Sequence, residues 1–84
     1  MRSGTVMFYT YILKLSDNSF YVGHSSNLRQ RVEYHKSHRV NTTKTSKSFK
    51  LIYYSAFLDE LKAIRFEKYL KSSSGFAFRN KHLI

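Results

Sequence analysis

The sequence contains no cysteine, proline or tryptophan, only three glycines and only five acidic residues. Without cysteine there is no disulfide, no thiolate zinc site and no cysteine nucleophile, so apolar packing or a partner must stabilise the fold. No apolar run approaches the ~18 residues of a membrane span, and the N-terminus lacks a sustained signal-peptide core. We therefore expect a soluble cytoplasmic protein without a membrane partner.

The 84 residues predict a single domain over residues 1–84. The hydrophobic fraction of 42% is ordinary for a globular domain and too high for a disordered basic tail. We find no internal repeat and no linker that would mark a second domain.

The few acids stand against 15 lysines and arginines, which gives a formal net charge of +10. No acid lies between Glu33 and Asp59, and none follows Glu67. The excess of cations in these two stretches predicts a polyanionic partner, although such runs can also be solvated surface. A membrane surface would require an amphipathic basic helix, whereas the stretch 36–48 is polar throughout. Nucleic acid is therefore the favoured partner.

Aromatic and β-branched residues predict strands over 8–15 and 20–24, joined by turn residues at 16–19. The register of this hairpin is open at this point. A two-residue turn would place Tyr11 and Tyr21 on opposite faces, and an odd-length loop would place them on the same face.

The rest of the chain predicts a helix over 27–36 capped by Ser25 or Ser26, a basic loop, and a third strand over 49–57. Asp59 is suited to cap a second helix that ends near Lys71. A break at 72–75 would then precede a short last helix over 76–84. The order strand, strand, helix, strand, helix, helix predicts an α+β domain with a small three-stranded antiparallel sheet packed against helices.

Glu67 is placed unusually for an acid. In a helix its neighbours Ala63, Ile64 and Leu70 share its face, so the carboxylate lies within the apolar arc. A buried carboxylate requires a cation or a metal opposite it. The structural alternative to a metal site is an ion pair with Lys71, four residues on, or with an arginine from another element.

Arg31 and His35 share a helix face, since they are four residues apart. The pair can serve a phosphate or an acid such as Glu67. The tyrosines can be packing residues, or one of them can act as a general base if its pKa is lowered by cations or hydrogen bonds. The glycines are isolated, so no phosphate loop is predicted, and no His and acid spacing indicates structural zinc.

Taken in order, these residues resemble the GIY-YIG endonuclease family. The segment Tyr-Val-Gly at 21–23 is similar to the YIG element, and Tyr-Thr-Tyr at 9–11 stands in place of GIY, with Tyr11 on its tyrosine. The run 21–32 places Arg31 on the family's catalytic arginine. His35 falls where the family has a helix tyrosine or histidine, and Glu67 falls on its metal-binding glutamate. The resemblance covers about residues 8 to 82, and its ending at 71–78 resembles the small stand-alone bacterial members.

Three departures from the family pattern are present. Tyr9 and Thr10 replace glycine and isoleucine, and His24 stands where many members have lysine. Asn80 is the candidate for an asparagine that the family often has near its C-terminus. The resemblance also implies that Tyr11 and Tyr21 share a face, which selects the odd-length hairpin loop.

The resemblance implies a divalent-metal-dependent endonuclease that hydrolyses phosphodiester bonds in DNA, with structure-specific cleavage left open. Glu67 would hold Mg²⁺ or Mn²⁺, and Tyr11 would orient or deprotonate the attacking water. Arg31 would stabilise charge on the phosphate, Tyr21 and His35 would position it, and the Gly23 backbone would allow its close approach. Other residues would contact the nucleic acid without reading sequence: His24, Lys36, Arg39, Lys44, Lys47, Lys50, Lys71, Arg79 and Asn80.

The alternative is a basic nucleic-acid-binding module without catalysis. In that case the basic loop binds the partner and Glu67 is an internal ion-pair residue. The oligomeric state and the choice between DNA and RNA are not set by the sequence.

Overall fold

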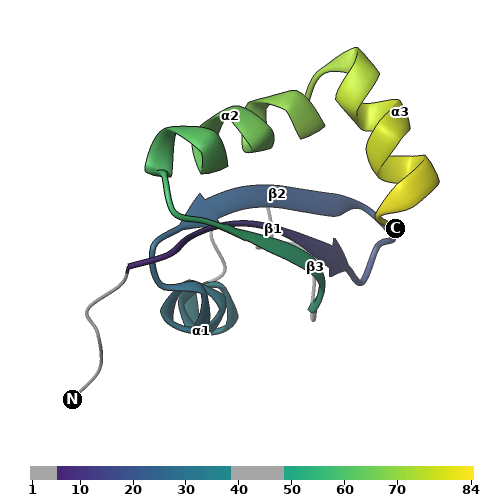
Figure 1. The fold of residues 1–84 in the computed structure, drawn as a ribbon. Coiled ribbons are helices and arrows are strands. Elements are labelled where there is room, and N and C mark those ends of the chain that lie inside the picture. Colours follow the sequence, from purple (N-terminus) through teal and green to yellow (C-terminus); the bar gives the residue numbers. More distant parts are fainter. Residues whose placement is uncertain (1–5, 39–48) are drawn as a thin grey trace.

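A three-stranded antiparallel sheet forms the middle layer of the fold (Figure 1). The computed structural model describes residues 6–38 and 49–84, and of residues 35–38 only the backbone. The elements follow in the predicted order, which confirms the α+β fold class. They are β1 (Phe8–Leu15), β2 (Phe20–Ser25), α1 (Leu28–His38), β3 (Phe49–Phe57), α2 (Glu60–Leu70) and α3 (Ser73–His82).

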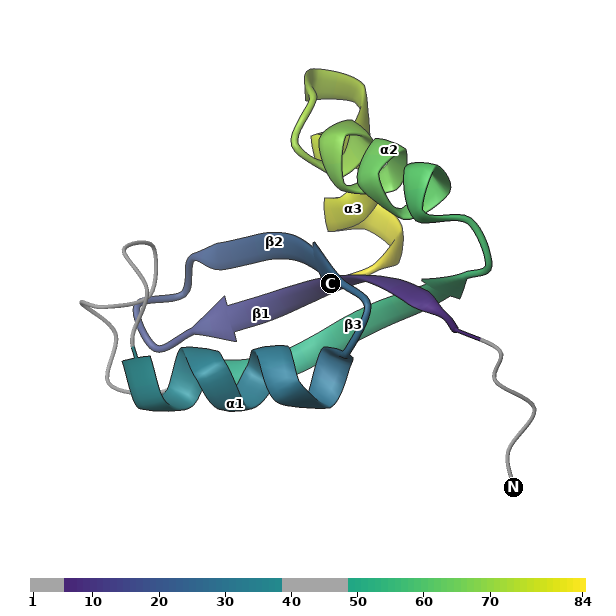
Figure 2. The same cartoon turned by 90° about the vertical axis from the view of Figure 1, so that its left-hand side faces the viewer.

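Strand β1 is the centre of the sheet, with the strand order β2-β1-β3. Helix α1 covers one face of the sheet, and α2 and α3 cover the other face (Figures 1 and 2). Residues Tyr11, Ile12 and Leu13 of β1 are completely buried, because side chains from both faces of a central strand enter a core. None of the helices in the described ranges is long and apolar enough to cross a membrane.

The two faces carry separate hydrophobic clusters. On the α1 face Tyr11, Leu13 and Leu15 form the buried set, and on the other face Ile12 and Val22 pack with Leu70 of α2. The alternation of β1 residues between these clusters follows from the two-residue period of a strand.

The β1–β2 hairpin has a three-residue loop, Ser16–Asn18. The Leu15 amide donates to the Ser19 carbonyl at 2.8 Å, and the Asn18 amide donates to the Leu15 carbonyl at 2.9 Å. Asn18 has a φ of 71°, a left-handed conformation that asparagine tolerates and that closes three-residue hairpin loops. The odd length pairs Leu13 with Tyr21, so Tyr21 lies on the same face as Tyr11, as the resemblance required.

Strand β3 contains a bulge that the sequence did not reveal. Ile12 pairs with Tyr53 but the next residue, Leu13, pairs with Leu51, which leaves Ile52 as the extra residue. As a result Ile52 and Tyr53, adjacent in sequence, both pack against the cluster on the α2 face.

The start of α1 differs from its prediction. Asn27, and not Ser25 or Ser26, is the capping residue: its side-chain oxygen accepts from the Gln30 amide at 2.9 Å, and its carbonyl accepts from the Arg31 amide at 3.0 Å. The Ser25 hydroxyl instead accepts from the Asn27 amide and stabilises the turn before the helix.

Helix α2 begins as predicted, with the Asp59 carboxylate accepting from the Leu61 amide at 2.9 Å. The predicted break at 72–75 was wrong in part. Ser72 is a helix cap whose hydroxyl accepts from the Gly75 amide, so the serine run forms the first turn of α3 and not a loop.

A buried hydrogen bond joins the central strand to α2. The Thr10 hydroxyl donates to the Ala63 carbonyl at 2.7 Å, and both residues are completely buried. Ala63 lies one helical turn before Glu67, so this bond fixes the part of α2 that carries the carboxylate.

We predict that Thr10→Val lowers the free energy of unfolding by about 1 kcal/mol, because the isosteric change removes a buried hydrogen bond. Chemical denaturation measures the change. Ser55, the β3 partner of Thr10, supplies a matched control: its buried hydroxyl has no hydrogen-bond partner among the described residues. Ser55→Ala should leave stability unchanged or raise it. Equal effects of the two substitutions would contradict this role of Thr10.

Candidate active site

The predicted catalytic residues come from four different elements. Tyr11 lies on β1, Tyr21 on β2, Arg31 and His35 on α1, and Glu67 on α2. His35 follows Arg31 by one helical turn, and its side chain is outside the described part of the chain.

Tyr11 lies above Gly23, its register partner on β2. A Cβ built on Gly23 would come 2.7 Å from the Tyr11 hydroxyl oxygen, which is closer than atoms can pack. Gly23 was expected to allow a phosphate to approach, and in the structure the Tyr11 phenol takes that space. The glycine of the Tyr-Val-Gly segment is therefore needed because any larger residue would clash with the Tyr11 phenol.

Arg31 reaches from α1 to the two tyrosines. Its pKa is raised, first by a hydrogen bond with the Tyr11 hydroxyl and further by a hydrogen bond with Tyr21. The rings of Tyr11 and Tyr21 are 6.3 Å apart, so the guanidinium and both phenols form one cluster under α1. Its Nε is buried without a hydrogen-bond partner among the described residues, and its Cζ lies 5.2 Å from the centroid of the Tyr34 ring.

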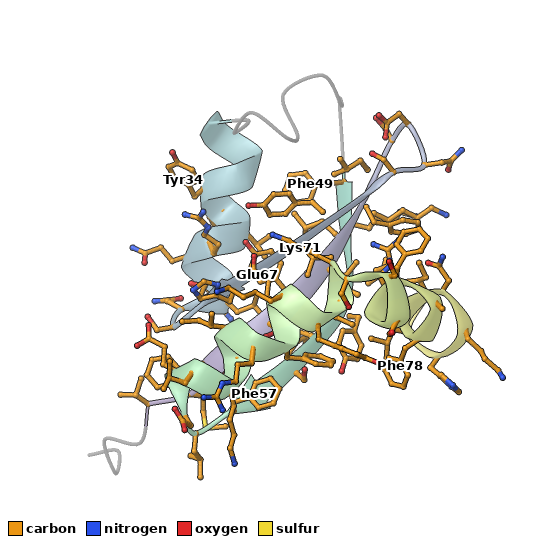
Figure 3. The ribbon with its side chains drawn as sticks, turned by 90° about the horizontal axis from the view of Figure 1, so that it is seen from above. Tyr34, Phe49, Phe57, Glu67, Lys71 and Phe78 are labelled. Atoms are coloured by element: carbon orange, nitrogen blue, oxygen red, sulfur yellow. The ribbon has the colours of Figure 1, made fainter. Side chains whose placement is uncertain are left out.

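Glu67 contacts a lysine and a histidine on the opposite face of the sheet. Lys71 Nζ contacts one carboxylate oxygen at 2.7 Å, and His24 Nδ1 contacts the other. The side chain of Glu67 is 16% exposed, which agrees with its predicted place in the apolar arc. Burial acts to raise the pKa of Glu67, but the hydrogen bonds from Lys71 and His24 outweigh burial and leave this pKa below its usual value. In Figure 3 Glu67 and Lys71 lie on one side of α2, away from Phe57 and Phe78.

The edge strand β2 joins these two groups of side chains. Gly23 faces the tyrosine cluster, and the next residue, His24, faces Glu67, because successive strand residues point to opposite faces. The groups are close enough to interact, since the Glu67 charge contributes to raising the pKa of Tyr11. The carboxylate and the cluster of one arginine and two phenols thus lie on opposite faces of the sheet, on either side of the same segment of β2.

The predicted nucleic-acid contacts are scattered. His24 and Lys71 flank Glu67, while Lys50 lies directly opposite Lys14 in the β1–β3 pair. The Asn80 amide oxygen accepts from Arg79 Nε at 3.2 Å in α3. The side chain of Lys36 and all of Arg39, Lys44 and Lys47 lie outside the described residues.

Sequence reasoning missed two structural partners of the site. It noted His24 as a replacement for lysine but not its contact with Glu67, which only the packing of α2 on β2 creates. It also missed the association of Phe20 and Phe76 with Arg79, although the spacing of Phe76 and Arg79 places them on one helix face.

The ionisation of Tyr11 can be tested directly. Burial is the main cause that raises its pKa from 10.0 to about 12. The pKa of Tyr11 is higher in the folded than in the unfolded protein. The contribution of Tyr11 to the free energy of unfolding is therefore fully present below pH 10 and is lost as the pH rises from 10 to 12. We predict that the ¹³Cζ resonance of Tyr11 keeps its neutral-phenol position at pH 10.5. A tyrosinate signal from Tyr11 at that pH, in folded protein, would contradict the burial argument.

Comparisons with known proteins identify the family of the chain. A family model described as the GIY-YIG catalytic domain matches residues 7–81. A UPF0213 protein of Staphylococcus haemolyticus is 34% identical over 67 residues, which cover 79% of this chain and 82% of that protein. A UPF0213 protein of Pediococcus pentosaceus is 35% identical over 79 residues, covering 89% of this chain and 83% of the relative.

A solved structure gives the same fold. The solution NMR structure of a UPF0213 protein from Bacillus halodurans aligns with a TM-score of 0.57 and 27% identity, over 89% of this chain and 83% of that chain. The family match extends over nearly the whole described chain and includes all the residues of the sheet edge discussed above. The chain belongs to the GIY-YIG family of nuclease domains.

Proposed function

We propose that the protein is a divalent-metal-dependent endonuclease that hydrolyses phosphodiester bonds in DNA. The observation that carries the proposal is the placement of Glu67 and of the Arg31 and tyrosine cluster on either side of the Gly23–His24 segment of the edge strand β2. A carboxylate can hold a hard cation and an arginine can stabilise phosphate charge, and both groups are suited to metal-dependent phosphodiester hydrolysis.

Glu67 is the residue suited to hold the metal. Magnesium in such sites takes one or two protein carboxylates and completes its ligands with water and phosphate oxygens. No group of three or more metal-ligating side chains occurs among the described residues, which fits a single-carboxylate site. The bound metal would polarise the phosphate and lower the pKa of a water. Binding there requires His24 or Lys71 to release one carboxylate oxygen.

Tyr11 would act on the attacking water. Its raised pKa of about 12 keeps the hydroxyl protonated at neutral pH, so its first role is to orient the water by a hydrogen bond. Loss of the Tyr11 proton would require additional positive charge beside it, and Arg31 supplies part of that charge through its hydrogen bond.

Arg31 would stabilise charge on the phosphate in the transition state. Two tyrosine hydroxyls hold the guanidinium in place, so little reorganisation is needed when the charge develops. Tyr21 on the edge strand would position the phosphate. His35, one helical turn after Arg31 on α1, would have the same role.

Other cations would track the nucleic-acid backbone. Lys14 and Lys50 form a directly opposed like-charge pair, which is unfavourable in the free protein and would be relieved by a phosphate. Lys71 lies beside Glu67, where a phosphate would compete for its charge. Outside the described residues, Arg39, Lys44 and Lys47 add charge to the same chain.

We predict that Glu67→Gln lowers Mg²⁺- or Mn²⁺-dependent nicking by more than about 100-fold, since even outer partners of metal ligands contribute about 10- to 100-fold. Salt-sensitive DNA binding should remain, because the substitution removes a negative charge. Nicking of single-stranded, duplex, flap and junction DNA measures the effect. Glu60→Gln, on the exposed first turn of the same helix, is the matched control and should cleave like the unmodified protein.

We also predict that Arg31→Lys lowers kcat by about 100-fold, because one ammonium cannot replace the planar fork that bonds both tyrosines. Steady-state kinetics on the best substrate give the value. Arg29→Lys on the exposed side of α1 provides the control, with an unchanged kcat expected. Equal rates for the two variants would remove Arg31 from the mechanism.

The ion pairs of Glu67 favour a second function, a basic nucleic-acid-binding module without catalysis. In this case Glu67→Gln lowers thermal stability, and no metal-dependent nicking occurs with any substrate. Nicking by the unmodified protein that disappears in folded Glu67→Gln protein rules this second function out.

A further inference from the structure

A groove of about 300 Å³ lies between β2 and the two C-terminal helices. We call it the Arg79 groove; its lining includes Phe20, Tyr21, Lys71, Phe76 and Arg79. Tyr21 also contacts Arg31, and Lys71 also contacts Glu67. The Arg79 groove therefore lies next to the candidate active site and shares Tyr21 with the tyrosine cluster.

Arg79 is an unusual residue for the interior of so small a domain. It is only 7% exposed, and burial lowers its pKa. Its Nε donates to Asn80, and within the described ranges no carboxylate forms an ion pair with it. A buried cation without an opposite charge is costly, so an anion that binds in the groove would gain a strong, nearly dry interaction.

Aromatic rings hold the Arg79 guanidinium in place. Its Cζ lies 5.1 Å from the centroid of Phe20 and 4.4 Å from that of Phe76. Phe76 is 50% exposed although it contacts Arg79, so part of its ring remains open to a ligand. The groove thus combines a fixed phosphate-binding fork with an open aromatic surface.

We propose that the Arg79 groove binds one unpaired nucleotide of the nucleic-acid strand, with its phosphate at Arg79 and its base against Phe76. Bases inside a duplex are stacked on each other and cannot reach an aromatic side chain, whereas unpaired bases stack on such rings without regard to sequence. The role of this nucleotide as a neighbour of the reacting phosphate rests on the proposed nuclease function. The binding itself does not depend on cleavage.

Binding is measured without metal, by fluorescence anisotropy of a labelled oligothymidylate and of a duplex of equal length. We expect Phe76→Leu to weaken binding of the single strand at least about fivefold, the low end of the effect of losing one base stack, and to leave duplex binding unchanged. Phe78→Leu is the matched control, because Phe78 is an exposed phenylalanine of the same helix outside the groove. It should bind the single strand like the unmodified protein.

Charge is tested in the same helix by Arg79→Gln and Lys81→Gln. Each removes one cation, so general electrostatic attraction predicts equal losses, whereas the groove predicts a larger loss of single-strand affinity for Arg79→Gln. Because Arg79 is buried, its substitution can unfold the protein. The ¹⁵Nε–Hε resonance of Arg79 in the unmodified protein therefore provides a second readout, which should shift with oligothymidylate and not with duplex.

Two results would overturn the proposal that the groove binds an unpaired nucleotide. One is equal single-strand affinity of the Phe76 and Phe78 variants, and the other is an Arg79 ¹⁵Nε–Hε resonance that does not shift when the single strand is added. These results are distinct from failure of the nuclease function. If the unmodified protein never cleaves but the Phe76 effect is present, the groove stands and the nuclease proposal falls. If it cleaves and the Phe76 variant binds like the Phe78 variant, the nuclease proposal stands and the groove falls.

Discussion

The register of the β1–β2 hairpin is the constraint on which the candidate site depends. Closure by a three-residue loop, with Asn18 in the left-handed region, pairs Tyr11 with Gly23 and brings Tyr21 to the same face. A slip of one residue would move Tyr21 to the α2 face and place a side chain where the Tyr11 phenol now lies. The loop length thus places Tyr21 on the same face as Tyr11. It also places Gly23, which has no Cβ, opposite Tyr11.

The edge position of β2 gives the site its two-sided character. A central strand would be covered on both faces and joined to neighbours on both sides, but β2 pairs only with β1. Successive residues of β2 also point to opposite faces of the sheet: Gly23 lies against Tyr11 on the α1 face, and His24 contacts Glu67 on the α2 face. The candidate residues Arg31 and Glu67 come from α1 and α2, and the buried hydrogen bond from Thr10 to Ala63 fixes the position of α2 next to the edge strand.

Several positive charges in the described structure lack a nearby negative partner. Glu67 forms an ion pair with Lys71 and contacts His24, whereas Arg79 is buried against aromatic rings and Lys14 faces Lys50 across the sheet. Such arrangements cost stability in the free protein, because they desolvate or oppose positive charges. A phosphate bound at Arg79, or between Lys14 and Lys50, would relieve the cost of that arrangement and add to the attraction that the net charge supplies.

The sequence by itself determined the element order, the α+β class and the identity of the candidate residues, because strand and helix periodicity and the order of Tyr11, Tyr21, Arg31 and Glu67 are local or ordered features of the chain. The residue pattern left the hairpin register open between two choices that depend on one residue of loop length, and only the family resemblance selected the odd-length loop. Only the tertiary structure decided three features: the contact of Glu67 with His24, the bulge at Ile52, and the packing of Arg79 against Phe20. Each of these joins elements distant in sequence. The bulge arises from the pairing of β1 with β3, and the other two contacts arise from the packing of α2 and α3 on β2, which no local pattern encodes.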